Sequence, residues 1–197
     1  RGVRGRHEPL ARRVARRGEP PHDLSADGAY LREFDPGAEF RSWAPLGLAF
    51  DRQGHLFVTN VGAPYQAVHE FEADGTLVRT YGKPDDFDFP NGVAVDANGN
   101  VYVADSNNGR LVVFDGDGNQ LGMIRRGVTA GDLGLPRGTA IDDSGRIYVA
   151  DISQQGIQSY QAIATGERQP KFIEALELNP KAVIADLGAA TGYPVVD

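Results

Sequence analysis

The sequence contains no cysteine, and only one methionine and one tryptophan. The absence of cysteine excludes disulfides, thiolate zinc sites and a cysteine nucleophile, but it does not decide between cytosol and exterior. No apolar run approaches the roughly 18 to 20 residues that cross a bilayer, and the N-terminus lacks the apolar segment of a signal peptide. The sequence therefore predicts a soluble chain with no membrane span. It begins at Arg1 rather than Met, so removal of a leader is one expectation, and an extracytoplasmic or cell-surface location is favoured over the cytoplasm.

Basic charge is scarce outside the first residues. Seven arginines and a single acid, Glu8, lie within positions 1–17, whereas the rest of the chain has 13 basic and 26 acidic residues. An acidic body repels phosphate, so nucleic-acid binding is not expected of it. We interpret residues 1–20 as a basic, solvated or poorly ordered arm, the one part suited to polyanions.

A repeat dominates the remainder of the sequence. "PLGLAFDRQGHLFVTN" (Pro45–Asn60), "PNGVAVDANGNVYVAD" (Pro90–Asp105) and "PRGTAIDDSGRIYVAD" (Pro136–Asp151) align without a gap, and their prolines lie 45 and 46 residues apart. A weaker fourth copy begins at Pro180. The downstream half repeats as well: "HEFEADGTLVRTYG" from His69 matches "HDLSADGAYLREFD" from His22. The predicted units are a partial blade at 21–35, blades at 45–82, 90–127 and 136–176, and a partial blade at 180–197.

Each unit holds four short runs of β-branched and aromatic residues, separated by Gly, Asn and Asp, as in antiparallel strands joined by tight turns. A four-stranded sheet of this size cannot bury both faces alone, so copies are expected to stack around an axis. The fold class predicted is an all-β propeller of four-stranded antiparallel blades. In the second unit the expected strands are Gly92–Asp96, Asn100–Ala104, Arg110–Asp115 and Gln120–Ile124.

The run "PNGVAVDANGNVYVADSNNGRLVVFDGDGN" (Pro90–Asn119) resembles the NHL repeat family throughout. The resemblance implies a propeller, usually six-bladed, that binds proteins, RNA or other ligands. The chain holds about four blades' worth of strands, so we favour part of a six-bladed ring. A closed four-bladed ring, in which residues 180–197 pair with residues 20–35, is the alternative, and a dimer sharing blades is a third. Assembly with further blades or another subunit is accordingly one expectation.

The connection into each inner strand and the loop between the second and third strands are expected on one face of a propeller, where ligands commonly bind. These positions are chemically mixed and rich in amides, which suits protein or glycan contacts better than a metal cage. The candidate ligand residues are Asn91, Arg137, Lys181, Asn107, Asn108, Gln154, Gln155 and Tyr65.

An enzymatic reading comes from more distantly similar propellers. The gluconolactonase and paraoxonase types look similar at "PNGVAVD", where the resemblance implies that Asn91 contributes to a central calcium site. The corresponding residues Leu46, Arg137 and Lys181 do not fit, because calcium needs several converging oxygen ligands. A lyase of the peptide-amidation type would need clustered histidines. The four histidines are scattered in sequence, so we assign no metal ligand. We expect no cofactor, and calcium is kept only as a disfavoured alternative.

Asp105 and Asp151, with Asn60 at the same repeat position, are interpreted as structural residues that accept backbone N–H groups in the following loop. Arg110 is expected to pair with an acid of its blade, and "DGDGN" (Asp115–Asn119) is expected to form a hairpin turn. We assign no catalytic residue. The predicted function is a non-catalytic propeller that binds a protein or glycan or serves as a scaffold. The alternative is a metal-dependent hydrolase or lyase, lactonase-like, with part of its site outside this chain.

Overall fold

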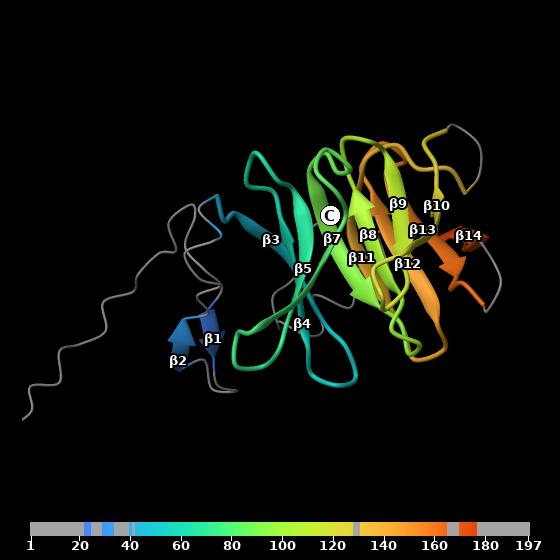
Figure 1. Cartoon of the computed structure of the whole chain (residues 1–197). Coiled ribbons are helices and arrows are strands. Elements are labelled where there is room, and N and C mark those ends of the chain that lie inside the picture. Colours follow the sequence, from blue (N-terminus) through green and yellow to red (C-terminus); the bar gives the residue numbers. More distant parts are fainter. Residues whose placement is uncertain are drawn as a thin grey trace, which may run out of the picture.

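The structure is a computed structural model (Figure 1) that describes residues 22–24, 29–33, 40, 42–127, 131–164 and 170–176. Over these residues the chain consists of three four-stranded antiparallel sheets and one two-stranded sheet. The described segments contain no helix that is long and apolar enough to cross a membrane. Lys181, the basic arm 1–20 and the predicted partial blade 180–197 lie outside the described residues, and so does the pairing that would close a four-bladed ring.

The strands follow one another in chain order within each sheet. The two-stranded sheet consists of β1 (His22–Leu24) and β2 (Tyr30–Glu33). The three larger sheets, named the first, second and third blade, are β3 (Pro45–Phe50), β4 (Leu56–Asn60), β5 (Ala67–Phe71) and β6 (Leu77–Tyr81); β7 (Pro90–Val95), β8 (Val101–Asp105), β9 (Arg110–Phe114) and β10 (Gln120–Ile124); and β11 (Pro136–Ile141), β12 (Arg146–Asp151), β13 (Gly156–Gln161) and β14 (Lys171–Leu176). The strand limits expected in the second blade are confirmed to within two residues.

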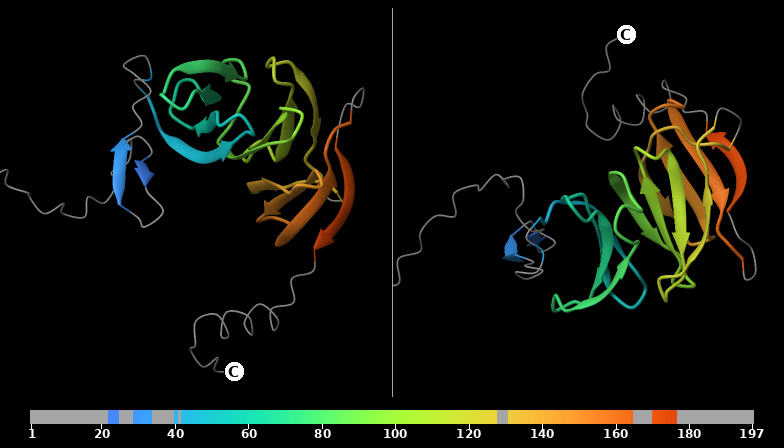
Figure 2. Two further views of the ribbon diagram at one scale, coloured as in Figure 1. Left: turned by 90° about the horizontal axis from the view of Figure 1, so that it is seen from below. Right: turned by 45° about the horizontal axis from the view of Figure 1, so that its top comes forward.

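The three blades stand side by side in an arc, and the β1–β2 hairpin lies apart from them (Figures 1 and 2). The first strand of each blade is the inner one: β3 contacts β7, and β7 contacts β11. This is the arrangement of propeller blades, and the predicted all-β fold class is confirmed.

The apolar core lies between neighbouring blades. Strand β8 is buried on both sides because it belongs to the middle blade: Val101 and Val103 pack toward the first blade, whereas Tyr102 and Ala104 pack toward the third. Successive side chains of a strand point to opposite faces of its sheet, so a strand covered on both faces reads as an unbroken apolar run. The sequence "VYVAD" is thereby explained by packing.

The "Pro-x-Gly" glycines of the first and second blades lie where two inner strands approach closely. A Cβ atom on Gly92 would collide with the carbonyl oxygen of Arg137 in the third blade, and one on Gly47 with the carbonyl oxygen of Asn91 in the second. Thr59 adds a polar tie, because its Oγ1 accepts a hydrogen bond from the N–H of Gly47 at 2.7 Å and donates one to the Asn91 carbonyl at 3.1 Å. These glycines therefore set the spacing of the blades.

Each turn after an inner strand is closed by an aspartate at its start. Oδ1 of Asp96 accepts hydrogen bonds from the backbone N–H groups two and four residues later, at 2.8 and 2.9 Å. Gly99, in the same turn, has a φ of 82°, which glycine adopts without steric cost. Asp51 and Asp142 repeat the hydrogen-bond pattern in the other two blades. This aspartate is consequently a requirement of the fold.

Candidate functional site

The two ends of the blades carry different connections. Pro90 pairs with Asp105 across β7 and β8, so the connection into the inner strand and the loop between the second and third strands lie at the same end. We call this end the loop face, made of positions 42–46, 61–66, 82–91, 106–109, 125–137 and 152–155 as far as the structure describes them. The opposite end is the turn face, made of the hairpin turns 51–55, 72–76, 96–100, 115–119 and 142–145.

The aligned residues at the ends of β4, β8 and β12 are part of the scaffold of the loop face. Oδ1 of Asp105 accepts the N–H of Asp88 at 2.8 Å, and its Oδ2 accepts the Arg110 Nε–H at 2.6 Å. Asp151 accepts N–H groups from both sides, including those of Gly134 at 2.7 Å and Ser153 at 2.9 Å. The predicted hydrogen bonds from backbone N–H groups of the following loop are confirmed for Asp151. Asp105 instead accepts a backbone N–H of the connection into its blade and side-chain donors from the following loop and the start of β9.

The predicted ligand residues occupy several kinds of position on this face. The Nδ2 of Asn107 donates to Oδ1 of Asp88, and the Nδ2 of Asn108 donates to Oδ2 of Asp105, both at 2.9 Å. Gln154 and Gln155 form the loop after Asp151, where Gln155 has a φ of 53°. The two asparagine amides therefore help to shape the loop between β8 and β9.

Of the remaining candidates, Tyr65 is exposed, whereas Asn91 and Arg137 are half-buried. Tyr65 follows a cis Ala63–Pro64 peptide bond, and 63% of its surface is exposed. Arg137 lies over the ring of Phe89, with its Cζ 5.6 Å from the ring centroid, and the backbone carbonyl of Asn91 joins two blades as described above. The roles of these residues in binding stay predictions.

Hollows on the loop face include two beside predicted ligand residues. One, of about 430 Å³, lies at the first blade beside Asn60, Pro64 and Tyr65. The other, of about 540 Å³, belongs to the second blade and is lined by residues of both charges: Asp85, Asp86, Asn108, Arg110, Met123, Arg125 and Arg126. The loop face thus combines one hollow bordered by the ring of Tyr65 with another lined by charged side chains.

His69, on β5 of the first blade, is a structural residue. Its Nδ1 lies 2.9 Å from Oγ1 of Thr80, and its ring packs against Phe40, Trp43 and Phe71. Burial lowers the pKa of His69 from 6.5 to about 4, so the imidazole is neutral near pH 7.

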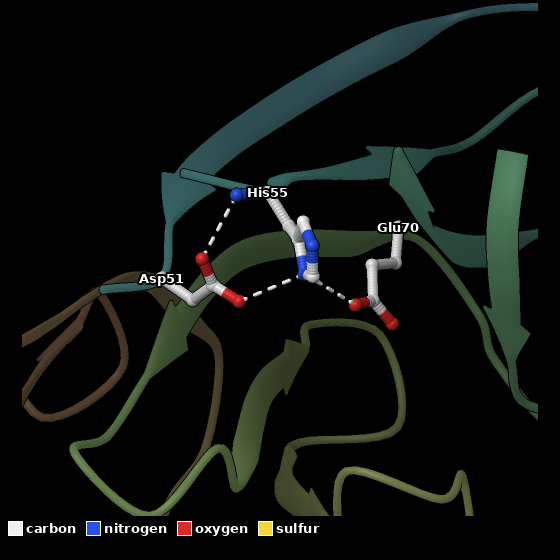
Figure 3. A group of neighbouring side chains, drawn as sticks. All are labelled: Asp51, His55 and Glu70. Atoms are coloured by element: carbon white, nitrogen blue, oxygen red, sulfur yellow. Dashed lines mark hydrogen bonds and ion pairs between the residues drawn. The ribbon is translucent and has the colours of Figure 1, made fainter. Parts of the chain in front are cut away.

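The turn face of the first blade carries a polar cluster that the sequence analysis did not find. Asp51 starts the turn after β3, His55 ends it, and Glu70 projects from β5 (Figure 3). Nδ1 of His55 lies 3.0 Å from Oδ2 of Asp51 and 3.0 Å from Oε1 of Glu70. Among the residues that the structure describes, this is a group of the metal-ligating type whose ligand atoms all lie within 4.8 Å of one another.

Neighbouring groups hold the cluster in place. The Tyr81 hydroxyl donates to Oε2 of Glu70 at 2.8 Å, and Arg79 Nε lies 3.8 Å from the same oxygen. Burial and the hydrogen bond to Glu70 raise the pKa of Tyr81 above its usual value, so the hydroxyl stays a donor. The Nε2 of His55 faces Oε2 of Glu72 at 3.4 Å.

A comparison of the copies would have exposed this cluster. His55 aligns with Asn100 and Arg146, and Glu70 with Val113 and Ser159. His55 is far in sequence from the other histidines, but it has two acidic partners: Asp51 in the same turn, and Glu70, which the antiparallel pairing of β4 and β5 brings close. The missing signal was the register of β4 and β5, which pairs Glu70 with Phe57 and so brings it close to His55.

The fold and its repeats place the chain in the class of β-propellers built from four-stranded blades. Residues 87–114 match the family model of the NHL repeat, so the chain contains an NHL repeat, as the sequence resemblance predicted. No match was found among curated proteins.

Solved structures share the fold at low identity. A protein of unknown function from Bacteroides caccae is 15% identical, with a TM-score of 0.57 over 82% of this chain and 55% of that chain. Virginiamycin B lyase from Staphylococcus aureus is 15% identical, with a TM-score of 0.55 over 77% of this chain and 47% of the lyase. A streptogramin B lyase is 18% identical, with a TM-score of 0.56 over 79% of this chain and 48% of that chain. The chain spans about half the length of these structures.

Proposed function

We propose that the chain is a non-catalytic propeller module that binds a protein partner through its loop face. The observation that carries the proposal is the exposure of two large side chains, Tyr65 at 63% and Ile152 at 59%. They lie on the corresponding loops of the first and third blades. The charged hollow of the second blade, with Arg125 and Arg126 on its wall, belongs to the blade between them.

This composition fits recognition of a protein surface. Aromatic residues and arginine are enriched in protein interfaces, and the energetic anchors of an interface are a few large side chains surrounded by polar groups. NHL repeats commonly mediate protein interactions, and this chain contains such a repeat. A glycan is the second ligand class that the amide-rich loops suit.

The state of the two aligned aspartates of the loop face supports binding over catalysis. Asp105 and Asp151 are buried, and both oxygens of each accept hydrogen bonds from the chain itself. A general acid or base must reach the substrate with a proton to give or accept. Two of the fold neighbours are lyases, and a hydrolase or lyase whose site includes residues outside this chain is the competing proposal.

The proposal is tested by placing a photo-crosslinking phenylalanine analogue at position 65 and, as a control, at position 78. Val78 is 41% exposed on β6, away from the loop face. We expect a specific protein adduct from position 65 that excess unlabelled wild type suppresses, and that excess Tyr65→Ala/Ile152→Ala does not. Equal adducts from both positions would reject the loop face.

The two alternatives, glycan binding and enzymatic activity, predict different results. Binding on a glycan array that Tyr65→Ala abolishes, without a protein adduct, would replace the protein partner by a glycan. Turnover of a lactone or ester by the full chain would replace the binding module by an enzyme.

A further inference from the structure

The aspartate that closes the turn of the second blade has both oxygens satisfied by its own blade. Oδ1 of Asp96 binds the turn's backbone N–H groups at 2.8 and 2.9 Å. Its Oδ2 accepts Nδ2 of Asn100 at 2.8 Å and the hydroxyl of Tyr102 at 3.0 Å. The third blade is alike, because Oδ2 of Asp142 accepts the hydroxyl of Tyr148 at 2.9 Å. In both blades this carboxylate is explained by the fold.

The first blade differs at each of these supporting positions. Phe57 stands where the other blades carry the tyrosine, so no hydroxyl is available for Oδ2 of Asp51. His55 replaces Asn100 and presents its Nδ1 at 3.0 Å instead. Glu70 replaces Val113, which is fully buried in the second blade. The second blade has an apolar side chain at that position, whereas the first blade has a buried acid that accepts the Tyr81 hydroxyl and also faces His55.

The cluster places two buried carboxylates against a single nitrogen of the histidine. The Asp51 and Glu70 side chains are 10% and 9% exposed, and Nδ1 of His55 faces an oxygen of each. A ring nitrogen carries at most one hydrogen, which is shared here between two carboxylates. Buried carboxylates are normally paired or bound to a metal ion.

The three side chains are close enough to converge on one ion, because their ligand atoms all lie within 4.8 Å of one another. Zinc binds histidine nitrogen and carboxylate oxygen at about 2.0 to 2.2 Å in mostly tetrahedral sites, so its ligand atoms lie about 3.4 Å apart. Both His55 to carboxylate distances are 3.0 Å. From this geometry we propose that Asp51, His55 and Glu70 form a binding site for a first-row divalent metal ion of the manganese to zinc series, with remaining positions taken by water.

The surroundings have the form of an outer shell. Metal-bound carboxylates and imidazoles are usually held by further hydrogen bonds that fix their orientation. Here the Tyr81 hydroxyl holds Glu70 at 2.8 Å, backbone N–H groups hold Asp51 at 2.8 and 2.9 Å, and Glu72 faces the far nitrogen of His55 at 3.4 Å. The His55 side chain is 26% exposed, which gives the ion and its waters a route from solvent.

The ligand set also predicts selectivity. Imidazole favours transition metals over calcium, which takes six to eight oxygen ligands. Of the common divalent ions, Zn²⁺ is expected to bind more tightly than Mn²⁺, and Ca²⁺ more weakly than both. This site lies on the turn face and is separate from the loop face proposed for the partner.

The test is titration of the chelator-stripped full chain with ZnCl₂, followed by calorimetry and by the melting temperature. The variants are His55→Asn, which installs the residue of the second blade, and Glu70→Gln, which keeps the shape and removes the charge. Loss of an outer-shell partner costs about 10- to 100-fold in affinity, so loss of either ligand is expected to cost roughly 100-fold or more. Asp74→Asn, an exposed acid of the neighbouring turn, is the charge-matched control and is expected to change affinity by less than about threefold.

Circular dichroism and metal-free melting of each variant separate loss of the site from loss of the fold. Wild type is expected to bind one zinc ion with a rise in melting temperature that His55→Asn abolishes. Three results would overturn the site: no saturable zinc binding by wild type, binding that His55→Asn and Glu70→Gln leave unchanged, or tighter binding of Ca²⁺ than of Zn²⁺. An adduct loss at position 65 in the crosslinking experiment would not affect this outcome, because it concerns the other face.

Discussion

Arg110 donates from its Nε to Oδ2 of Asp105 at 2.6 Å, and the Asp105 side chain is completely buried. The first blade carries the pair Asn60 and Ala67 at the same repeat positions. The arginine and the aspartate therefore occur together in the second blade, and both are absent from the first.

We expect the two residues to be energetically coupled. Asp105→Asn alone leaves the guanidinium without its buried carboxylate, whereas Asp105→Asn with Arg110→Ala recreates the combination of the first blade. In a double-mutant cycle of urea unfolding, the coupling free energy is expected to be about 1 to 3 kcal/mol. Additivity of the two changes within about 0.5 kcal/mol would show that the ion pair does not hold this loop.

The Tyr102 hydroxyl is predicted to contribute more to the stability of the fold than the hydroxyl of its counterpart Tyr148. The Tyr102 hydroxyl donates to Asp96 and also accepts the N–H of Ile163, both at 3.0 Å, and the residue is fully buried. Tyr102→Phe leaves a buried N–H without its acceptor and is expected to lower the free energy of unfolding by about 1 to 3 kcal/mol. Tyr148→Phe is the matched control at a more exposed position and is expected to lower the free energy of unfolding by less. Equal shifts of the denaturant midpoint in the two variants would contradict this.

The close approach of the inner strands gives a third prediction. Gly92→Ala forces a Cβ against the Arg137 carbonyl of the next blade, and overpacking of this kind costs about 1 to 3 kcal/mol. Gly116→Ala is the control, because its nearest atom would be the Gly99 carbonyl oxygen at 3.6 Å. Chemical denaturation of both variants checks the prediction, which fails when the two changes have the same effect.

The buried His69 predicts a specific pH dependence. In the unfolded chain a histidine has a pKa of about 6.5, and burial lowers the pKa of His69 to about 4 in the folded chain. Between these values the unfolded state binds a proton that the folded state does not, so the free energy of unfolding falls as the pH drops from about 6.5 to about 4. The difference corresponds to roughly 3 kcal/mol.

The comparison variant is His69→Val, the residue found at the equivalent Val112. Wild type is expected to lose stability relative to this variant on going from pH 7.5 to pH 4.5, with no change in their difference above pH 7. Urea midpoints of both proteins across this range provide the measurement. A difference that stays constant with pH would show that His69 does not titrate in this way.

The repeat made much of the fold predictable from the sequence. Strand positions, turn types and the common face of Asn91 and the 106–109 loop follow from aligned copies, because all copies meet the same packing demands. The reach of Asp105 back to Asp88 was not predicted, since it joins segments 17 residues apart whose approach is set by the register of two strands.

The turn-face cluster was missed for a related reason. Asp51 and His55 are close in sequence, but Glu70 comes from another strand, and its role depends on which face of the sheet it occupies. The replacement of the usual tyrosine by Phe57 is visible in the sequence, yet its consequence for Asp51 emerges only when the hydrogen bonds of Asp96 are known.

The metal site that distinguishes the first blade from its neighbours is tested most directly by an anomalous difference map. The map is recorded at the zinc edge from crystals of the full chain soaked in ZnCl₂. We expect a single strong peak within about 2.2 Å of Nδ1 of His55, Oδ2 of Asp51 and Oε1 of Glu70. Zinc peaks at other positions with none between these three atoms would contradict the metal site.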